Sequence, residues 1–423
     1  MVGIPFIYFS ILFIVLYLKN KKIDIACYTI LIYAVSSFFS ILIDFYRLRG
    51  FDTLHYDISF EATFVYCSLL TLCIIPISLY SNAKIKYIEP IRNIRFLKGF
   101  AWFCAIYFLF NLLMSISDII FILTSDMGEL RNFLYKSEFS AGWIGHFNPI
   151  VRLPFAFMNM LMGCPWIFML LGFFSFFIQK LPVKYMLLFF IGSLLGPINS
   201  IIGVDRSGMA YYLISLGACY LIFTPYMDKS QKRKITVALS VLVAFIVLYL
   251  TTLTNSRFEE SDGGKLSGSI ASLVSYFGQS FINFCYYYDT FRTPDPSLQL
   301  IFPFTYQYFI GTEHAGGVGM QEYLSLLSGK SLGVFYTFMG QISTTAGNVS
   351  MIIYCFIVFV LSMILINRKR TFVANLKQLF FYYLFSSICF LGLFGHYYGS
   401  SSHTFSVVIF SFIIPYLMKY NKQ

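Results

Sequence analysis

The sequence predicts an all-α, polytopic integral membrane protein with about eleven transmembrane helices and one long external loop of short helices. Hydrophobic residues make up 58% of the chain and charged residues only 12%. Apolar runs recur at close to the ~20 residues needed to cross a hydrocarbon core of ~30 Å. Such runs are typical of helices, which satisfy their own backbone groups in lipid, whereas a membrane barrel would show alternating strands.

The apolar runs follow one another along most of the chain. The expected spans are 2–18, 25–44, 60–80, 99–123, 152–178, 185–204, 207–227, 235–254, 347–367, 376–396 and 404–418. The first run could instead be a signal peptide. Its apolar region is long and no small-residue cleavage site precedes Lys19, so we expect a membrane anchor.

The charges are sorted along the sequence. Twenty of the 30 Lys and Arg lie in or beside six short segments, together with only three of the 19 acids. These segments are 19–22, 84–98, 180–184, 229–234, 368–377 and 419–422. Cytoplasmic loops are enriched in Lys and Arg. Eleven spans place all six segments in the cytoplasm, with the N-terminus outside and the C-terminus inside.

The spans divide the chain into three parts of one integrated membrane domain. Residues 1–254 hold the first eight spans with a short external segment at 124–151, and residues 347–423 hold the last three. Between them lies an external loop, 255–346, much longer than any other connection. Loops of this length are uncommon unless they carry function.

The long loop is organised rather than low in complexity. Its apolar stretches 270–288, 298–310 and 323–327 are separated by Gly and Pro residues, which predicts short helices packed over the membrane surface. In the first stretch Ser275, Gln279 and Asn283 recur at helical spacing among apolar residues. That helix could lie in the membrane interface. The alternative is a structural cap over the outer ends of the spans.

The other external segment, 124–151, also predicts a short helix. Ser125 and Asp126 can cap it, and Arg131 and Lys136 follow its first turn before a break at 142–146.

The sequence contains no pattern of a cofactor or metal protein. The nine cysteines are an odd number, and all but Cys285 lie within expected spans, without disulfide or metal-ligand spacing. We interpret them as small packing residues. A phosphate-binding Gly-rich loop, a paired-acid motif and a His-rich cluster are missing from the sequence. We expect no cofactor, no metal and no nucleic-acid partner.

The most compact charged constellation is the turn 203–208 between the sixth and seventh spans. Arg206 and Ser207 stand at the N-terminus of the seventh span, where free backbone N–H groups and the helix dipole favour an anion. The guanidinium fits phosphate oxygens in a bidentate way. The alternative is that Asp205 caps the helix and pairs with Arg206 locally.

This turn, the long loop and one further segment resemble the O-antigen and capsule repeat-unit polymerases (Wzy type). The further segment is 333–340, followed by Ala346 and Gly347, and it is similar to that family's Tyr-Thr pair and glycines before a helix. The family usually has an acid before the last glycine. Here Thr344, Thr345 and Ala346 stand instead, so a role for an acid is not carried over.

The resemblance implies a metal-independent, membrane-embedded glycosyltransferase of the bacterial inner (plasma) membrane. Such an enzyme moves a growing glycan from undecaprenyl pyrophosphate onto another lipid-linked repeat unit at the outer face of the membrane. The implied partners are undecaprenyl-pyrophosphate-linked glycans and the lipid bilayer, and a chain-length regulator is a further candidate.

Arginines are the expected means of holding the pyrophosphate, because the chain lacks a compact carboxylate pair for a metal. The outer side has three Lys but seven Arg, at 47, 49, 131, 152, 206, 257 and 292. We expect the main role for Arg206, then Arg131 and Arg257. For Arg47, Arg49 and Arg152 we expect side chains that extend to the lipid headgroups.

Further residues complete the expected site. Substrate contacts are predicted for Arg292, Tyr336 and Tyr398 besides the three main arginines, although tyrosines at span ends are also typical of an interfacial aromatic belt. The candidates for a general base are Asp205, Asp289, Glu313, His314, Glu322 and His396, which spacing does not rank. We assign catalysis to Arg206, Asp205, His314 and His396, because a histidine titrates near neutrality.

Three other functions compete with polymerisation. An O-antigen ligase uses the same donor with another acceptor. A lipid-linked oligosaccharide flippase or other transporter commonly shows internal repeats and short loops, whereas this chain shows no convincing similarity between its halves and has one dominant external loop. A membrane scaffold would need more docking surface than the short cytoplasmic loops offer.

Overall fold

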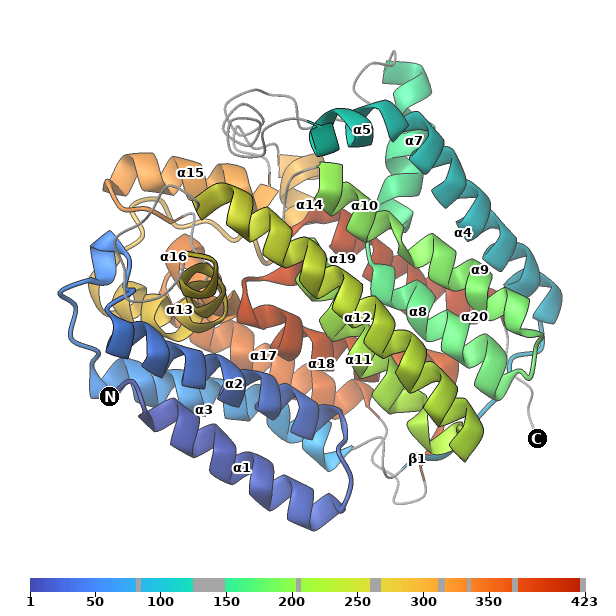
Figure 1. The fold of residues 1–423 in the computed structure, drawn as a ribbon, viewed down its shortest axis with the longest axis horizontal. Helices are drawn as coiled ribbons and strands as arrows, with labels where there is room; N and C mark the ends of the chain where they lie inside the picture. The colour runs from blue at the N-terminus through green and yellow to red at the C-terminus, as the bar shows by residue number, and fades with distance from the viewer. Residues whose placement is uncertain are drawn as a thin grey trace. The chain divides into compact units, whose positions relative to one another are not determined.

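The computed structural model describes residues 1–80, 85–124, 149–202, 207–258, 268–310, 316–332, 336–366 and 372–418. These residues are almost entirely helical (Figure 1). They form two compact units: residues 1–87 with 270–404, and residues 88–269 with 405–423. Each unit is described by itself.

Unit 1 contains the N-terminal helices together with the helices of the predicted loop. Its helices are α1 (Ile4–Asn20), α2 (Ile25–Tyr46), η1 (Phe51–Thr53), α3 (Phe60–Leu79), α13 (Gly268–Thr290), α14 (Pro303–Thr305), η6 (Tyr306–Ile310), α15 (Gly316–Ser328), α16 (Thr337–Ala346), α17 (Asn348–Leu365), α18 (Leu376–Phe390), η7 (Leu391–Leu393) and η8 (Tyr397–Gly399). Two short strands, β1 (Ile85–Ile88) and β2 (Phe372–Ala374), pair with each other.

Unit 2 contains the middle of the chain and its C-terminal end. Its helices are α4 (Ile94–Met114), α5 (Ile116–Thr124), α7 (Pro149–Leu161), α8 (Pro165–Phe173), η4 (Phe174–Ile178), α9 (Val183–Ser193), α10 (Leu195–Ile202), α11 (Ser207–Phe223), η5 (Thr224–Tyr226), α12 (Lys229–Phe258), η9 (Ile409–Ile413) and α20 (Ile414–Met418). Helix α19 (Ser401–Val408) begins in unit 1 and ends in unit 2.

Many of these helices are long and apolar enough to cross a membrane. Among the described residues eight meet that test, or nine if the bent pair 153–161 and 165–178 is one span. The bend of 56° falls where Gly163 and Pro165 interrupt the helix. Helix α1, with 17 residues, is shorter, and α12 overlaps the eighth expected span. The all-α membrane fold is confirmed, whereas the count of eleven spans stays a prediction.

Helix α18 lies at the centre of unit 1. In its apolar window 83% of the residues are buried, against 22% in α17, although both are long and hydrophobic. A helix that is apolar all round is expected to be enclosed by other helices or by lipid. Helix α18 packs on α2, α3 and α17, and Tyr33 of α2 donates a 2.7 Å hydrogen bond to the carbonyl of Cys389. We infer that the exposed face of α17 contacts lipid.

Helices α2 and α13 cross at a very close contact. A Cβ atom added at Gly278 would lie 2.5 Å from the carbonyl carbon of Phe39, so only glycine fits there without a shift of backbone. The hydroxyls of Ser36 and Ser40 donate to the carbonyls of Phe277 and Gly278, at 2.7 and 2.6 Å. Small residues and hydroxyl contacts of this kind allow membrane helices to approach closely.

The helices of the predicted loop share a hydrophobic core within unit 1. Its buried members come from α13 and the residue after it, from α15 and from the segment before α16: Tyr287, Phe291, Met320, Leu324, Leu332 and Tyr336. Burial of a large apolar side chain contributes ~1.5–3 kcal/mol. The loop is therefore packed by its own side chains. Residues 125–148, which hold most of the other external segment, lie outside the described part.

Helix α8 is the central, most buried helix of unit 2. Eight of its nine residues are buried, and it packs against α9 and α11. Gly192 of α9 lies against Cys104 of α4, where a Cβ would be 2.8 Å from the Cβ of Cys104. Close glycine contacts therefore build the helix packing of this unit too.

Candidate functional site

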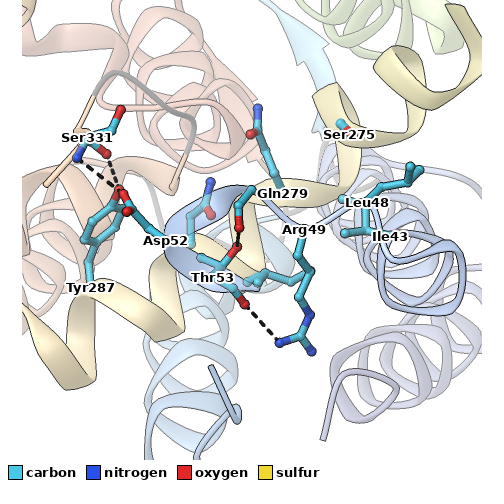
Figure 2. A pocket seen from close by; sticks show the side chains of 12 residues that line it. Ile43, Leu48, Arg49, Asp52, Thr53, Ser275, Gln279, Tyr287 and Ser331 are labelled. Carbon is cyan, nitrogen blue, oxygen red and sulfur yellow. Dashed lines mark hydrogen bonds between the residues drawn. The ribbon is translucent and has the colours of Figure 1, made fainter. Parts of the chain in front are cut away.

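A polar pocket lies in unit 1 at the C-terminal end of α2. Its volume is about 310 Å³. The lining residues come from the end of α2 and the segment after it, from one face of α13, and from one residue before α16 (Figure 2): Ile43, Leu48, Arg49, Gly50, Asp52, Thr53, Ser275, Gln279, Ile282, Asn283, Tyr287 and Ser331. We call this the Arg49 pocket.

Helix α13 supplies one wall through residues spaced four apart. Ser275, Gln279, Asn283 and Tyr287 all line the pocket, because side chains at this spacing share one face of a helix. The polar stripe seen in the sequence therefore faces a cavity inside unit 1. The crossing of α13 with α2 at Gly278 holds this wall against the opposite one.

The opposite wall is the segment that follows α2. The helix ends at Tyr46, and Arg47 adopts the left-handed conformation with φ of 57°, which turns the chain away from the helix axis. Residues 48–53 then fold back as a short turn in which the Thr53 backbone N–H donates to the carbonyl of Gly50 at 3.0 Å.

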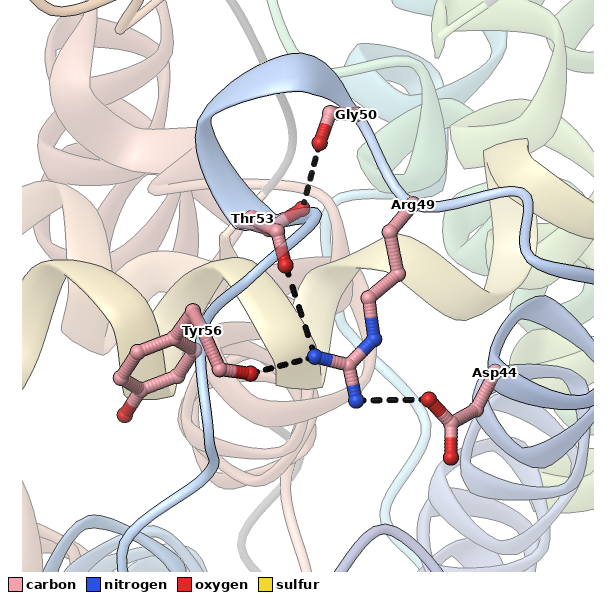
Figure 3. A network of polar contacts seen from close by, with 5 residues as sticks. All are labelled: Asp44, Arg49, Gly50, Thr53 and Tyr56. Atoms are coloured by element: carbon pink, nitrogen blue, oxygen red, sulfur yellow. Dashed lines mark hydrogen bonds and ion pairs between the residues drawn. The ribbon is translucent and has the colours of Figure 1, made fainter.

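Arg49 ties this segment together (Figure 3). Its Nη2 forms a 2.6 Å ion pair with Asp44, and its Nη1 donates to the carbonyls of Tyr56 at 2.5 Å and Thr53 at 3.4 Å. The side chain is 13% exposed. Its Nε is buried and has no hydrogen-bond partner among the described residues.

One end of the pocket is formed by Asp52, Ser331 and Tyr287 (Figure 2). Asp52 accepts a hydrogen bond from the backbone N–H of Ser331 at 3.4 Å, and the hydroxyl of Tyr287 donates to the Ser331 carbonyl. Burial raises the pKa of Tyr287 well above its usual range, so its hydroxyl stays protonated and remains a donor.

A second polar cluster surrounds the fully buried side chain of Tyr336. The phenol oxygen of Tyr336 accepts from the side chains of Gln321 at 3.1 Å and Thr344 at 3.3 Å, and Thr344 also donates to the Gln341 carbonyl at 3.1 Å. The side chain of Gln341 accepts from the backbone N–H of His396 at 2.5 Å. The structure thus brings Tyr336 and His396 into one connected set of contacts. We call it the Tyr336 network.

His396 lies between two spans, at residues 376–393 and 401–418, and is 8% exposed. Its ring lies edge to face against Tyr354, with 5.3 Å between ring centroids. Burial lowers the pKa of His396 to about 4, because the charged imidazolium would lose its hydration. Its imidazole is therefore neutral near pH 7.

Other predicted residues have partners of their own. The hydroxyl of Tyr398 shares a 2.5 Å hydrogen bond with Ser387. Arg292 is exposed and donates to the carbonyls of Tyr288 and Phe291, at 3.4 and 3.2 Å, beyond the C-terminus of α13. Asp289, a candidate base, accepts a short hydrogen bond from Tyr56. None of these residues lines the Arg49 pocket.

Much of the predicted catalytic set falls on residues outside the described part of the chain. Arg131, Asp205, Arg206, Glu313 and His314 all lie there. Arg257 lies in the last turn of α12, and its side chain is outside the description as well. The proposed convergence of Arg131, Arg206 and Arg257 therefore stays a prediction.

Arg49 is the residue that sequence reasoning misjudged. We expected its side chain to extend toward lipid headgroups, but its guanidinium is mostly buried and bonded to Asp44 and two carbonyls. A hint was available in the sequence, since Asp44 stands five residues before it at the end of an apolar run. The fold back after α2, which brings the two together, could not be deduced from spacing.

The fold and the pocket define a multi-pass, all-α membrane protein with a polar cavity at the end of one of its spans. No family model, no curated protein and no solved structure matches the chain.

Proposed function

We propose that this protein polymerises lipid-linked oligosaccharide repeat units into a surface polysaccharide, by glycosyl transfer at the outer face of the bacterial inner membrane. The observation that carries the proposal is the Arg49 pocket, where a polar face of the long loop closes over the end of a span. In the predicted orientation the C-terminal end of α2 is at the outer surface. A lipid-linked substrate needs this combination of a polar site and adjacent bilayer.

The loop helices also support an enzyme over a simple cap. A cap would be expected to close its polar contacts within the protein, as the Tyr336 network does. The α13 face instead leaves Ser275 and Gln279 on a cavity wall. Ligand sites are concave and carry a few placed polar groups on a mostly apolar lining.

In the proposed reaction a hydroxyl of the acceptor glycan attacks the anomeric carbon of the donor glycan. The new C–O bond forms as the bond to the undecaprenyl pyrophosphate breaks, and the hydroxyl proton passes to a base. Arg206, with Arg131 and Arg257, is proposed to bind the departing pyrophosphate. One well-placed charge-assisted donor contributes roughly 3–4 kcal/mol of transition-state stabilisation.

The base is proposed among Asp205, His314 and His396. A neutral imidazole such as that of His396 can accept a proton, and the backbone N–H of His396 donates to the Gln341 side chain, which ties this residue to the helices of the loop. Because the side chain is buried, this role requires that substrate binding opens a path to it.

Deletion of the gene tests the function against its rivals. Surface glycan is separated on a gel: loss of polymerisation leaves single-repeat glycan and removes the long ladder. Complete absence of surface glycan would instead indicate the alternatives, an O-antigen ligase or a lipid-linked oligosaccharide flippase. An unchanged ladder would contradict all three.

Arg206→Lys tests the proposed pyrophosphate contact. Lysine retains the charge but loses the planar fork, so we expect shorter chains at equal protein level. A ladder of wild-type length would remove Arg206 from the site. Arg95→Lys, on the predicted cytoplasmic side, is the matched control.

A further inference from the structure

We propose that the Arg49 pocket binds a neutral, hydroxyl-rich ring, namely a sugar residue at the accepting end of the glycan, and does not bind the pyrophosphate of the donor. The glycan is named on the strength of the proposed function. The choice of a neutral ligand rests on the pocket itself.

The charge of the pocket disfavours an anion. Among the described residues that line it, the charged ones are Arg49 and Asp52, whose charges cancel. The guanidinium of Arg49 already has protein partners. Its Nη2 forms a 2.6 Å ion pair with Asp44, and its Nη1 donates to two backbone carbonyls. A pyrophosphate needs several free cationic donors to offset the loss of its hydration. This pocket does not offer them.

The pocket does offer neutral hydrogen-bonding side chains that have no partner in the described part of the chain. No described residue forms a hydrogen bond with the side chains of Ser275 and Gln279. Groups of this kind are normally satisfied by a ligand or by ordered water. Hydroxyls match them well, since each hydroxyl both donates and accepts.

The carboxylate of Asp52 adds an acceptor at one end of the pocket. It accepts one weak bond, from the backbone of Ser331 at 3.4 Å, and an ionised carboxylate has capacity for about four. Hydrogen bonds to an ionised acceptor are roughly twice as strong as neutral ones. Asp52 therefore favours a ligand that brings hydroxyl donors.

Size and apolar lining also fit a sugar. The volume of about 310 Å³ is at the lower end of the ~300–1,000 Å³ typical of ligand pockets. Ile43, Leu48 and Ile282 provide apolar surface beside the polar groups. A pyranose has hydroxyls around its edge and C–H groups on its faces, so one ring can meet both kinds of wall.

The binding test uses the full-length protein in detergent and a defined probe. The probe is the repeat-unit oligosaccharide released by mild acid from the surface polysaccharide of the same strain. Its affinity is measured by saturation-transfer NMR for wild type, Gln279→Leu and Asp52→Asn. Each variant should bind about tenfold more weakly, as expected for the loss of one good hydrogen bond.

The matched control for Asp52→Asn is Asp57→Asn, because Asp57 is an exposed acid five residues along the same segment and does not line the pocket. It should bind as wild type does. Ser275→Ala removes an unpartnered hydroxyl and leaves no orphaned group behind, so it should fold normally and still weaken binding. Thermal unfolding of each variant checks that the fold is intact.

Three outcomes would overturn the proposal. Wild type could fail to bind the oligosaccharide, which would leave water as the occupant of the pocket. The pocket variants could bind as tightly as wild type. Inorganic pyrophosphate could displace the oligosaccharide, which would make the ligand anionic. The deletion gel is independent of these results, so an unchanged ladder with normal oligosaccharide binding would refute polymerisation but leave the sugar site standing.

Discussion

The Arg49 pocket and the Tyr336 network are both polar clusters built from the loop helices, yet their hydrogen bonds are used differently. In the Tyr336 network, the side chains of Gln321, Thr344 and Gln341 all contact protein partners around the fully buried Tyr336. In the pocket, Ser275 and Gln279 have none among the described residues. The difference teaches that the network holds the loop in place, while the pocket is available to a ligand.

The contact that creates the pocket should be the most sensitive point. Gly278→Leu places a side chain where backbone atoms of Phe39 and Ser40 lie within 2.7 Å of a Cβ. We expect α13 to separate from α2 and the free energy of unfolding to fall by about 3 kcal/mol or more. Gly99→Leu is the control, because nothing lies within 4 Å of a Cβ there. Equal melting curves for the two variants would contradict the crossing.

The pH dependence of stability should report on the Tyr336 network through His396. Its pKa falls from 6.5 unfolded to about 4 folded, so the unfolded chain binds more protons between these values. Stability should therefore decrease as pH falls from about 6.5 to 4, by up to about 3 kcal/mol. The variant His396→Phe should flatten this decline in Tm, whereas His55→Phe, at an exposed position, should not. Parallel profiles for wild type and His396→Phe would show that another group titrates.

Tyr336→Phe should separate stability from binding. The change removes hydrogen bonds of the Gln321 and Thr344 side chains, and one such bond contributes about 0.5–1.5 kcal/mol to stability. Tm should fall while affinity for the repeat-unit oligosaccharide stays at the wild-type value. Gln279→Leu should show the reverse, with unchanged Tm and weaker binding. If both variants change both quantities, the two clusters act as one.

Arg49→Lys should have the smallest effect on stability. Lysine keeps the charge beside Asp44 but cannot also bond both carbonyls with a planar fork, which we expect to cost about 1 kcal/mol. The control is Arg47→Lys, since Arg47 is exposed at the helix end. A larger loss of stability in Arg47→Lys than in Arg49→Lys would mean that the end of α2, and not the guanidinium contacts, holds the segment after α2 in place.

Much of the fold could be predicted because it follows from local composition. Apolar runs such as 25–44 and 60–80 correspond to α2 (Ile25–Tyr46) and α3 (Phe60–Leu79), since the bilayer sets the length of a span. The polar stripe of α13 was also visible at helical spacing. The packing of this helix against α2 could not be seen in the sequence, because the close approach at Gly278 involves a segment more than two hundred residues away.

The candidate site was harder to predict than the fold. The sequence pointed to arginines near membrane boundaries, but Arg49 was set aside because its contacts arise from a turn after α2. Tyr336 was expected to contact substrate and is enclosed by protein. Charge and spacing identify residue types suited to a chemistry, whereas burial and partners depend on packing between distant segments.

The most direct test of the proposed function is polymerisation by the purified protein. The full-length chain is reconstituted into liposomes with the lipid-linked single repeat unit isolated from the deletion strain, and the products are separated on a gel. We predict a ladder of longer glycans in the presence of wild type and a shorter ladder with Gln279→Leu. Single repeats that stay single beside a correctly folded wild-type protein would contradict the account.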